Sequence, residues 1–303
     1  MKRKVLDGEF FERLERVALY MQDAMSGFFG GSRKAHGHGN TVEFSDFREY
    51  VPGDDLRRID WNVYARFEKY FIKLFTDERQ LHHRIIIDCS ASMATGKPEK
   101  AVTALRLAAA LAYLATCAMD RVSIQLLHGS ALTDLTGVIL GKSAATSAAM
   151  LLEDVDFYGE SDLRGAVLGD PSPGYDDGLT VVISDLLTDS DWKSMVDFLL
   201  FRHREVMLIQ VLSPEEVHPS LTGALSGDVH LIDLESAAPG DARNVRMKLS
   251  KKHMKAYLAA LDDYYREIRE FCTSRGVSYV SATTDEPIEK ILFEKGYETD
   301  RIK

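Results

Sequence analysis

The 303-residue sequence contains little cysteine, no long apolar run and no excess of basic residues. Its three cysteines, Cys89, Cys117 and Cys272, are widely separated and form no Cys-x-x-Cys pair, which argues against a disulfide framework and against a zinc site. No stretch reaches the roughly 18 consecutive apolar residues of a membrane span, and residues 1–7 contain no apolar signal core. We therefore expect a cytoplasmic protein whose thiols are reduced.

The balance of charge is acidic, with 47 aspartate and glutamate residues against 37 lysine and arginine residues and a net charge of −10. Binding to nucleic acid requires a basic face that neutralises phosphates, so this balance disfavours a general nucleic-acid-binding protein. Hydrophobic residues make up 45% of a chain that is long enough to bury one large core or two modest ones. The composition predicts a globular protein.

From Arg84 onward, short apolar runs alternate with segments of helical periodicity. The runs that predict strands are 84–88, Val122–Leu127, Val181–Ile183, Val206–Leu212 and Val277–Val280, and the segments that predict helices are Glu99–Met119, Ser143–Asp154, Asp191–Arg204 and Ser250–Ser274. Such alternation is typical of a parallel sheet covered by helices on both faces. We therefore predict an α/β fold with a doubly wound, mostly parallel sheet.

The first 80 residues have a different pattern. Residues Glu9–Met25 have the apolar spacing of a helix, and a glycine-rich stretch follows them. From Thr41 to Phe75, aromatic and polar residues alternate around a turn signal at 52–54, which favours short strands and hairpins over helices. We predict an N-terminal domain, 1–80, made of a helix, a glycine-rich loop and a β-rich arm, and an α/β domain, 81–303.

A candidate cation site lies at the end of the first strand predicted for the α/β domain. The apolar run Ile85–Ile87 ends in Asp88, and hydroxyl groups follow at Ser90 and Ser92. In open α/β sheets, ligands gather beyond the carboxyl ends of the strands. Carboxylate and hydroxyl oxygens on such a loop suit a hard divalent cation, Mg²⁺ above all, or else Ca²⁺ or Mn²⁺.

Other loops have to complete this site, because a divalent cation takes about six oxygen ligands. The apolar run Leu179–Ser184 is followed by Asp185, which predicts a second carboxylate at the same edge of the sheet. Ser161 follows a glycine turn and precedes a helical segment, and its neighbour Asp162 competes for the same role. The predicted metal ligands are therefore Asp88, Ser90, Ser92, Ser161 and Asp185.

Two other interpretations use the same residues. Asp88, Ser90 and Ser92 also suit the N-terminal cap of a helix, where such side chains satisfy backbone N–H groups, and the chain is then a structural scaffold without metal. Alternatively, Asp88 is the nucleophile of a Mg²⁺-dependent phosphohydrolase, and Asp185 holds the metal. Phosphatases of the haloacid dehalogenase type generally carry a second aspartate two residues after the nucleophile, a position that Ser90 occupies here.

The five predicted ligands resemble the metal-ion-dependent adhesion site of von Willebrand factor A domains, whose loops hold one Mg²⁺ and leave a position open, usually for a partner's carboxylate. Ser161 stands where these domains commonly have threonine, a change that keeps the oxygen ligand. More narrowly, the segments Glu43–Asp55, Arg58–Trp61 and Ala65-Arg66 are similar to the signature of the prokaryotic family called domain of unknown function 58. This similarity spans nearly the whole chain after residue 30.

The resemblance implies a von Willebrand factor A-like fold and a non-enzymatic role in binding another protein. Proteins of this family are typically encoded beside MoxR-type AAA+ ATPases. The expected partner is therefore such an ATPase, for which the chain acts as an adaptor or assembly partner. A carboxylate of the partner is expected to bind through Mg²⁺.

The signature residues of the N-terminal domain have two interpretations. They are Arg48, Tyr50, Pro52, Gly53, Asp54, Asp60, Trp61 and Arg66. Pro-Gly-Asp is turn chemistry, and the arginines, Arg58 included, are placed to pair with the aspartates and to pin the arm on the sheet domain, which favours a structural role. The alternative is partner binding, because Tyr, Trp and Arg often carry the energy of interfaces.

Overall fold

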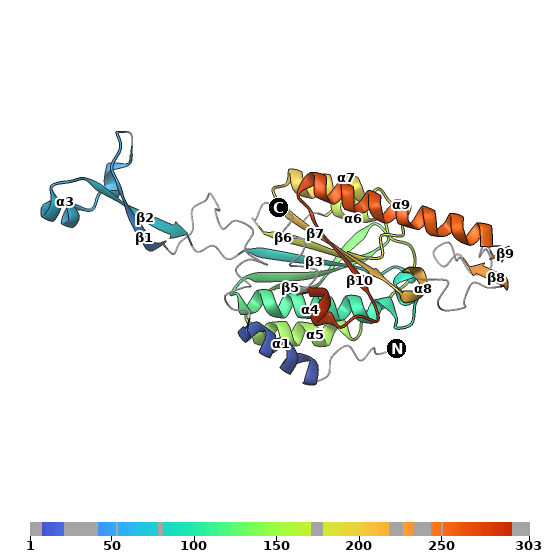
Figure 1. Ribbon diagram of the computed structural model, residues 1–303. Coiled ribbons are helices and arrows are strands. Elements are labelled where there is room, and N and C mark those ends of the chain that lie inside the picture. Colours follow the sequence, from blue (N-terminus) through green and yellow to red (C-terminus); the bar gives the residue numbers. More distant parts are fainter. Residues whose placement is uncertain are drawn as a thin grey trace. The chain divides into compact units, whose positions relative to one another are not determined.

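The computed structural model describes residues 8–20, 42–52, 54–77, 81–170, 178–217, 227–232, 244–249 and 251–292. They belong to two compact units (Figure 1). One unit, here called the α/β unit, comprises Met1–Gly31 and Leu81–Lys303, and the other, the β-rich unit, comprises Ser32–Gln80. The candidate metal ligands all belong to the α/β unit.

The α/β unit is built on a sheet of six strands. They are β3 (His82–Asp88), β4 (Arg121–His128), β5 (Ala131–Ile139), β6 (Leu179–Ser184), β7 (Glu205–Leu212) and β10 (Ser278–Thr283), in the spatial order β10-β7-β6-β3-β4-β5. Every neighbouring pair is parallel except β4 and β5, which are antiparallel. The sheet is therefore mostly parallel, with one antiparallel strand at its edge.

Helices cover both faces of this sheet (Figure 1). On one face lie α1 (Gly8–Tyr20), α4 (Lys100–Cys117), α5 (Lys142–Leu152) and α10 (Ile288–Lys290), and on the other lie α6 (Leu163–Leu168), α7 (Trp192–Phe201) and α9 (Lys251–Arg275). Shorter elements are the 3-10 helix η2 (Ala91–Ala94), α8 (Pro214–Val217) and the antiparallel pair β8 (Gly227–Ile232) and β9 (Asn244–Leu249).

The sheet separates two hydrophobic cores, because successive side chains of a strand point to opposite faces. In β3, Ile85 and Ile87 pack in the core under α4, whereas Ile86 packs in the core under α6, α7 and α9. Among the described residues, α4 is the one helix that is long and apolar enough to span a membrane, but 83% of it is buried inside the α/β unit. Its apolar composition is that of a core helix.

The predicted fold class is confirmed: the sheet is doubly wound and mostly parallel, with helices on both faces. Each strand predicted from residue 84 onward is present, as β3, β4, β6, β7 and β10, and the four predicted helices are α4, α5, α7 and α9. The sequence does not predict β5, because this edge strand is half-exposed along its length and lacks the continuous apolar run of a buried strand.

The N-terminal helix packs with the α/β unit. Phe10 and Leu14 of α1 are buried in the core beside α4, and the ring of Phe11 makes an edge-to-face contact with Tyr113 of α4, at 5.9 Å between ring centres. The prediction grouped residues 1–80 in one domain, whereas the structure divides them at Gly31. The predicted glycine-rich loop lies outside the described residues.

The β-rich unit contains one antiparallel pair, β1 (Val42–Glu49) and β2 (Phe71–Asp77). Between these strands lie the 3-10 helix η1 (Leu56–Arg58) and the α-helix α3 (Trp61–Phe67). The prediction of strands and hairpins without helices is wrong for this connection. Asp60 stabilises the start of α3, because its carboxylate caps the helix by accepting the backbone N–H groups of Asn62 and Val63.

Candidate metal centre

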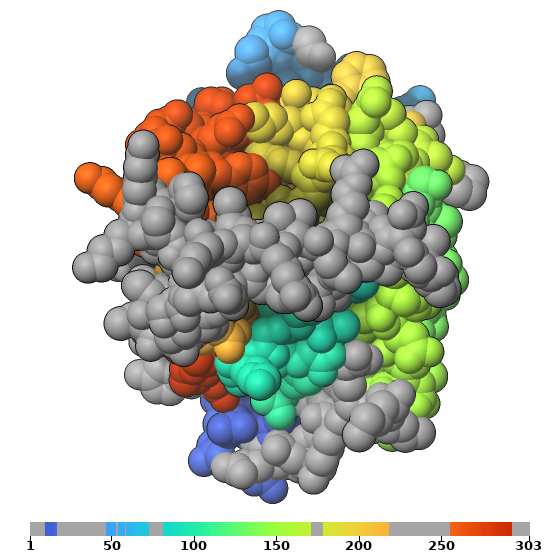
Figure 2. Space-filling model, turned by 90° about the vertical axis from the view of Figure 1, so that its right-hand side faces the viewer, coloured from blue at the N-terminus to red at the C-terminus, as the bar shows by residue number. Residues whose placement is uncertain are grey.

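The candidate site lies at the point where the winding of the sheet reverses. From β3 the chain proceeds to β4 and β5 on one side, and then returns to β6, β7 and β10 on the other. Ligands of such sheets bind beyond the carboxyl ends of the strands at this switch point, where Asp88 ends β3 and Ser184 ends β6. Figure 2 looks onto this edge, where surface from near residues 95 (teal), 160 (yellow-green) and 190 (yellow) faces the viewer.

Asp88 is at the centre of the site, and it is almost completely buried, with 1% of its surface exposed. Its Oδ1 atom accepts the backbone N–H of Ser90 at 3.0 Å, and its Oδ2 atom accepts the hydroxyls of Ser184 at 2.6 Å and Ser161 at 3.2 Å. Burial raises the pKa of Asp88, and the charge of Asp185 raises it further, although the hydrogen bond from Ser184 acts in the opposite direction.

Ser90 and Ser92 extend this cluster, because their Oγ atoms lie 3.0 Å apart. Ser90 stands at the N-cap position of η2, yet its side chain makes no capping hydrogen bond. The N-cap interpretation therefore does not explain the hydroxyl of Ser90. The side chain of Ser90 is fully buried, whereas that of Ser92 is partly exposed.

Ser161 is brought to the cluster by a short parallel bridge between Gly129 and Ser161. The backbone of the β3–α4 loop joins the same segment, since the N–H of Ala91 donates to the carbonyl of Gly159 at 2.9 Å. Asp162, the competing candidate, points elsewhere: its carboxylate caps α6 by accepting the N–H of Gly165 at 2.9 Å. The structure thus assigns Ser161 to the cluster and Asp162 to the helix cap.

Asp185 lies beside the cluster, but its carboxylate is engaged in other contacts. It accepts one hydrogen bond from the ammonium group of Lys100 at 2.8 Å and another from the backbone N–H of Leu187 at 3.0 Å. In the described part of the chain, no hydrogen bond joins the Asp185 side chain to the other four predicted ligands. The structure therefore links four of the five, Asp88, Ser90, Ser92 and Ser161, and places the fifth one residue after Ser184.

Lys100 supplies a positive charge that the sequence analysis did not anticipate. Its side chain is 1% exposed, and its Nζ atom donates to Asp185 at 2.8 Å and to Glu216 of α8 at 2.6 Å. Burial lowers the pKa of Lys100, but the attraction of the two carboxylates outweighs this effect, and the net pKa lies above its ordinary value. Glu216 is itself held by the backbone N–H of Ser213 at 2.7 Å.

Lys100 and Ser184 belong to the candidate site but were not predicted from the sequence, and the sequence indicates them to different degrees. Lys100 is the first residue of a helix that is rich in Ala and Leu. A lysine at the start of so apolar a helix indicates a buried positive charge, which needs a carboxylate as its partner. Ser184 ends an apolar run directly before the predicted ligand Asp185, which indicates its position but not its direction. No sequence signal connects Lys100 with Glu216, because 116 positions separate them.

The oxygen atoms of the cluster fit a hard divalent cation. Neighbouring ligands of an octahedral Mg²⁺, each about 2.1 Å from the ion, lie about 3 Å apart, and the oxygens of Ser90 and Ser92 are 3.0 Å apart. Among the residues that the structure describes, no three His, Cys, Asp or Glu side chains come together. The donor set is one carboxylate with three hydroxyls, which suits Mg²⁺ or Mn²⁺ better than zinc or copper.

Two of the signature residues of the β-rich unit, Arg48 and Asp54, pair with each other. Arg48 donates to Asp54 at 2.9 Å, and Asp54 also accepts the backbone N–H of Val51 at 2.9 Å. This backbone hydrogen bond lowers the pKa of Asp54, and Arg48 lowers it further, although desolvation acts in the opposite direction. The predicted arginine–aspartate pairing is therefore present inside this unit.

Of the remaining signature residues, Asp60 caps α3 and the ring of Tyr50 contacts the ring of Tyr70. Pro52 and Arg66 are exposed, and Trp61 is 60% exposed. Gly53 and the side chain of Arg58 lie outside the described residues. Trp61 meets Tyr64 edge to face at 6.1 Å, and Tyr64 stacks on Tyr70 at 4.6 Å between ring centres. Trp61 is the signature residue with the largest aromatic surface open to solvent.

Comparison with known proteins identifies relatives over most of the chain. The family model described as "Protein of unknown function DUF58" matches residues 46–260. The uncharacterized proteins Mb1516 of Mycobacterium bovis and Rv1480 of Mycobacterium tuberculosis are each 28% identical to the chain over 235 residues, which cover 76% of this chain and 72% of the relative. These relatives are themselves uncharacterized.

Solved structures with a similar fold are more distant. The conserved hypothetical protein BatB from Bacteroides thetaiotaomicron has a TM-score of 0.43 at 14% identity, covering 73% of this chain and 98% of BatB. The VWA domain of SpRpn10 has a TM-score of 0.40 at 9% identity, covering 71% of this chain and 94% of that domain. At these scores the comparison adds nothing to the fold, which follows from the order and direction of the strands.

Proposed function

The chain belongs to the DUF58 family of proteins of unknown function, and from this premise we propose that it is a metal-dependent protein-interaction module. In this proposal the cluster of Asp88, Ser90, Ser92 and Ser161 holds one divalent cation, Mg²⁺ or Mn²⁺, with Asp185 beside it. A carboxylate of a partner protein binds to the cation. The expected partner is a MoxR-type AAA+ ATPase, as the resemblance of the signature implies.

The observation that carries the proposal is the convergence of these oxygens. Ser161, which lies 73 positions after Asp88, and Ser184 at the end of β6 both donate a hydrogen bond to Asp88 at the end of β3. In the metal-free chain these buried hydroxyls and the carboxylate satisfy one another by hydrogen bonds, as buried polar groups generally must. A bound cation satisfies the same lone pairs at once.

Each residue has a defined task in this proposal. Asp88 supplies the single full negative charge among the four linked groups, and the serines supply neutral oxygens that leave the cation electron-poor. The cation then offers a strong positive charge to a partner's Glu or Asp. Lys100 pairs with both Asp185 and Glu216 and offsets one of their two negative charges, which weakens their repulsion of an incoming carboxylate.

A capture experiment tests this function. The purified chain is immobilised and exposed to a purified MoxR-type AAA+ ATPase in Mg²⁺ and in EDTA, and the bound ATPase is quantified. We expect capture in Mg²⁺, loss in EDTA, and at least tenfold weaker capture by Ser90→Ala. Chelation also strips Mg²⁺ from the nucleotide of the ATPase, so the comparison between variants decides the outcome.

Ser147→Ala is the matched control for this experiment, because Ser147 is an exposed serine of the α/β unit whose hydroxyl donates to the carbonyl of Ser143, away from the cluster. It should capture the ATPase as the wild type does. Equal capture by the wild type and Ser90→Ala would rule out a role for the cluster in this contact.

One observation supports the phosphohydrolase interpretation, and another argues against it. Lys100 beside Asp185 is a cation of the kind that steadies a phosphoryl group. Its ammonium group is, however, engaged by two carboxylates, and Ser90 occupies the position two residues after Asp88 where such phosphatases generally carry a second aspartate. Hydrolysis of p-nitrophenyl phosphate in Mg²⁺ that disappears in Asp88→Asn would restore this interpretation.

A further inference from the structure

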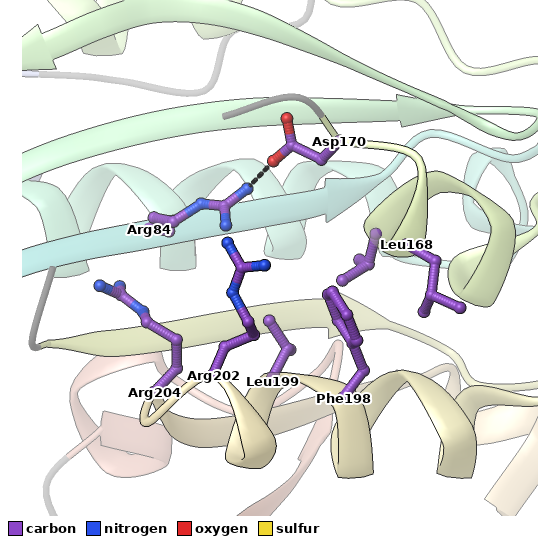
Figure 3. Close-up of a pocket in the computed structure, with 8 residues that line it drawn as sticks. Arg84, Leu168, Asp170, Phe198, Leu199, Arg202 and Arg204 are labelled. Atoms are coloured by element: carbon purple, nitrogen blue, oxygen red, sulfur yellow. Dashed lines mark hydrogen bonds and ion pairs between the residues drawn. The ribbon is translucent and has the colours of Figure 1, made fainter. Parts of the chain in front are cut away.

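A small cavity lies at the edge of the sheet opposite the candidate metal centre. It has a volume of about 70 Å³ and lies where β3 and β7 begin (Figure 3). Arg84, which lines it, forms an ion pair with Asp170, and Arg204 donates to the carbonyl of Leu179 at 3.0 Å. These arginines already have partners inside the protein, so the cavity does not call for a charged ligand.

The surface beside the candidate metal centre is different, because the segment that follows α5 exposes polar and aromatic side chains there. Val155 and Phe157 pack against the core under α4. The side chains of Asp156 and Tyr158, which alternate with them along this extended segment, therefore point to solvent. Tyr158 is 60% exposed, and Glu160 is exposed as well.

The two acids of this segment are unpaired. Within the described part of the chain, the carboxylates of Asp156 and Glu160 make no ion pair and no hydrogen bond. Both charges are therefore open to a cationic group from outside, and the net charge of −10 favours the approach of a basic partner to the molecule.

The ring of Tyr158 is held in position between these acids. It stacks on the ring of His128 at 4.7 Å between ring centres, and Nε2 of His128 lies 3.1 Å from the carbonyl oxygen of Asp156. Since His128 covers one face of the tyrosine ring, the exposed part of the side chain includes the other face. The face of an aromatic ring attracts cations, and guanidinium groups most often.

Backbone hydrogen bonds attach this segment to the loop of the metal centre. The N–H of Tyr158 donates to the carbonyl of Cys89 at 2.9 Å, and the N–H of Ala91 donates to the carbonyl of Gly159 at 2.9 Å. Cys89 and Ala91 flank the predicted ligand Ser90. Surface from near residue 160 (yellow-green) faces the viewer at this edge in Figure 2. A partner that places a carboxylate on the cation thus brings its neighbouring residues over this segment.

We propose that Asp156, Tyr158 and Glu160 form a second contact surface, which binds an arginine that lies close in the partner's sequence to the carboxylate on the cation. This inference rests on the proposed function and adds the chemistry of the partner: an acidic residue with an arginine a few positions away. The guanidinium group stacks on the open face of Tyr158 and donates to the two carboxylates. Arginine suits this surface better than lysine, because its planar group can stack and donate at the same time.

Selection from a peptide library tests this surface. Phage that display random heptapeptides with a glutamate fixed at the centre, in several copies per particle, are bound to the immobilised full chain in Mn²⁺ and eluted with EDTA. Display in several copies makes weak binding measurable. We expect arginine to be enriched at least threefold over the starting library at positions on either side of the glutamate.

Two variants of exposed residues examine the surface directly. Glu160→Lys reverses a charge and should abolish the enrichment of arginine, and Tyr158→Ser removes the ring and should lower the enrichment at least twofold. Both variants should bind Mn²⁺ in calorimetry as the wild type does, which separates this surface from the metal centre. The matched controls are Asp262→Lys, at an exposed acid of α9, and Phe201→Ser, at a 79% exposed residue of α7. Both controls should select the same peptides as the wild type.

The outcomes separate this inference from the function on which it rests. Metal-dependent selection of peptides without enriched arginine, or equal enrichment by the wild type and Glu160→Lys, overturns the second contact surface and leaves the metal-dependent interaction standing. Enrichment of aromatic residues in place of arginine also overturns it, because the acids then have no role. Absence of any metal-dependent selection contradicts the proposed function and this inference together.

Discussion

Three charged side chains are buried together beside the candidate metal centre: Asp88, Asp185 and Lys100. Lys100 pairs with Asp185 and with Glu216 of α8, and it offsets part of the negative charge of these acids in the metal-free chain. A buried ion pair of this kind contributes little relative to apolar packing, but removal of one partner leaves an uncompensated charge. Substitution of Lys100 should therefore lower the stability of the protein.

Lys100→Met should lower the free energy of unfolding by about 3 kcal/mol in EDTA, because Asp185 loses its buried partner. Mg²⁺ should raise the melting temperature of this variant more than that of the wild type, since the cation replaces the lost positive charge. Urea unfolding and thermal unfolding, each with and without Mg²⁺, measure both effects.

Lys142→Met is the control for this substitution, because Lys142 is a half-exposed lysine of α5 that pairs with Glu15 at 3.7 Å on the surface. It should change stability by less than about 1 kcal/mol. A Lys100→Met protein that Mg²⁺ stabilises no more than the wild type contradicts the idea that the lysine and the metal both offset the charge of Asp185.

The raised pKa of Asp88 makes a prediction about pH. Burial, reinforced by the charge of Asp185, lets the folded chain keep the Asp88 proton at a pH where the unfolded chain has already lost it. The free energy of unfolding of the metal-free protein should therefore fall as pH rises from about 3.9 through the raised pKa of Asp88. In Asp88→Asn this fall should be absent, and the same pH profile in both proteins contradicts the assignment.

At the scale of the elements, the residue next to Ser161, Asp162, is fixed because it caps α6. Asp162 accepts the N–H of Gly165 at 2.9 Å and the hydroxyl of Ser190 at 2.8 Å, so the carboxylate joins α6 to the β6–α7 connection. The peptide that carries Ser161 is thereby held in position. An alanine at 165 would displace this carboxylate, since its Cβ atom would lie 2.1 Å from Oδ2 of Asp162.

Gly165→Ala should destabilise the protein by about 1 kcal/mol, although alanine is the better helix former, because the new methyl group displaces the capping carboxylate. The sign should reverse without that carboxylate: in an Asp162→Ala background, Gly165→Ala should stabilise by about 0.5 kcal/mol or more. Chemical unfolding of the two single variants and the double variant measures this cycle. Destabilisation by the same amount in both backgrounds would show that the cap is not the cause.

The sequence was a good guide to the elements that lie in the centre of the sheet. A buried parallel strand such as β3 is a continuous apolar run, and a core helix such as α4 has dense helical periodicity, so both are visible in a single sequence. The edge strand β5 and the helix α3 were missed because their residues are largely exposed. Their formation depends on pairing with β4 and on the cap of Asp60, which composition does not reveal.

At the scale of the whole molecule, the candidate site depends on contacts between residues that are distant in sequence. Asp88 and Ser161 were predictable, because the carboxyl ends of parallel strands and the loops that follow them meet at one edge. The contact of Asp185 with Lys100, 85 positions away, was not predictable, because it depends on the direction of two side chains. The net charge of −10 favours the approach of a cation to the molecule as a whole, an effect that salt weakens.

Titration of Mn²⁺ into the purified, metal-free chain, followed by calorimetry, tests the central claim most directly. The account predicts that one ion binds per chain, that Ser90→Ala binds it at least tenfold more weakly, and that Ser147→Ala binds it as the wild type does. Absence of saturable binding to the wild type, or equal affinities of the wild type and Ser90→Ala, would contradict a metal centre formed by Asp88, Ser90, Ser92 and Ser161.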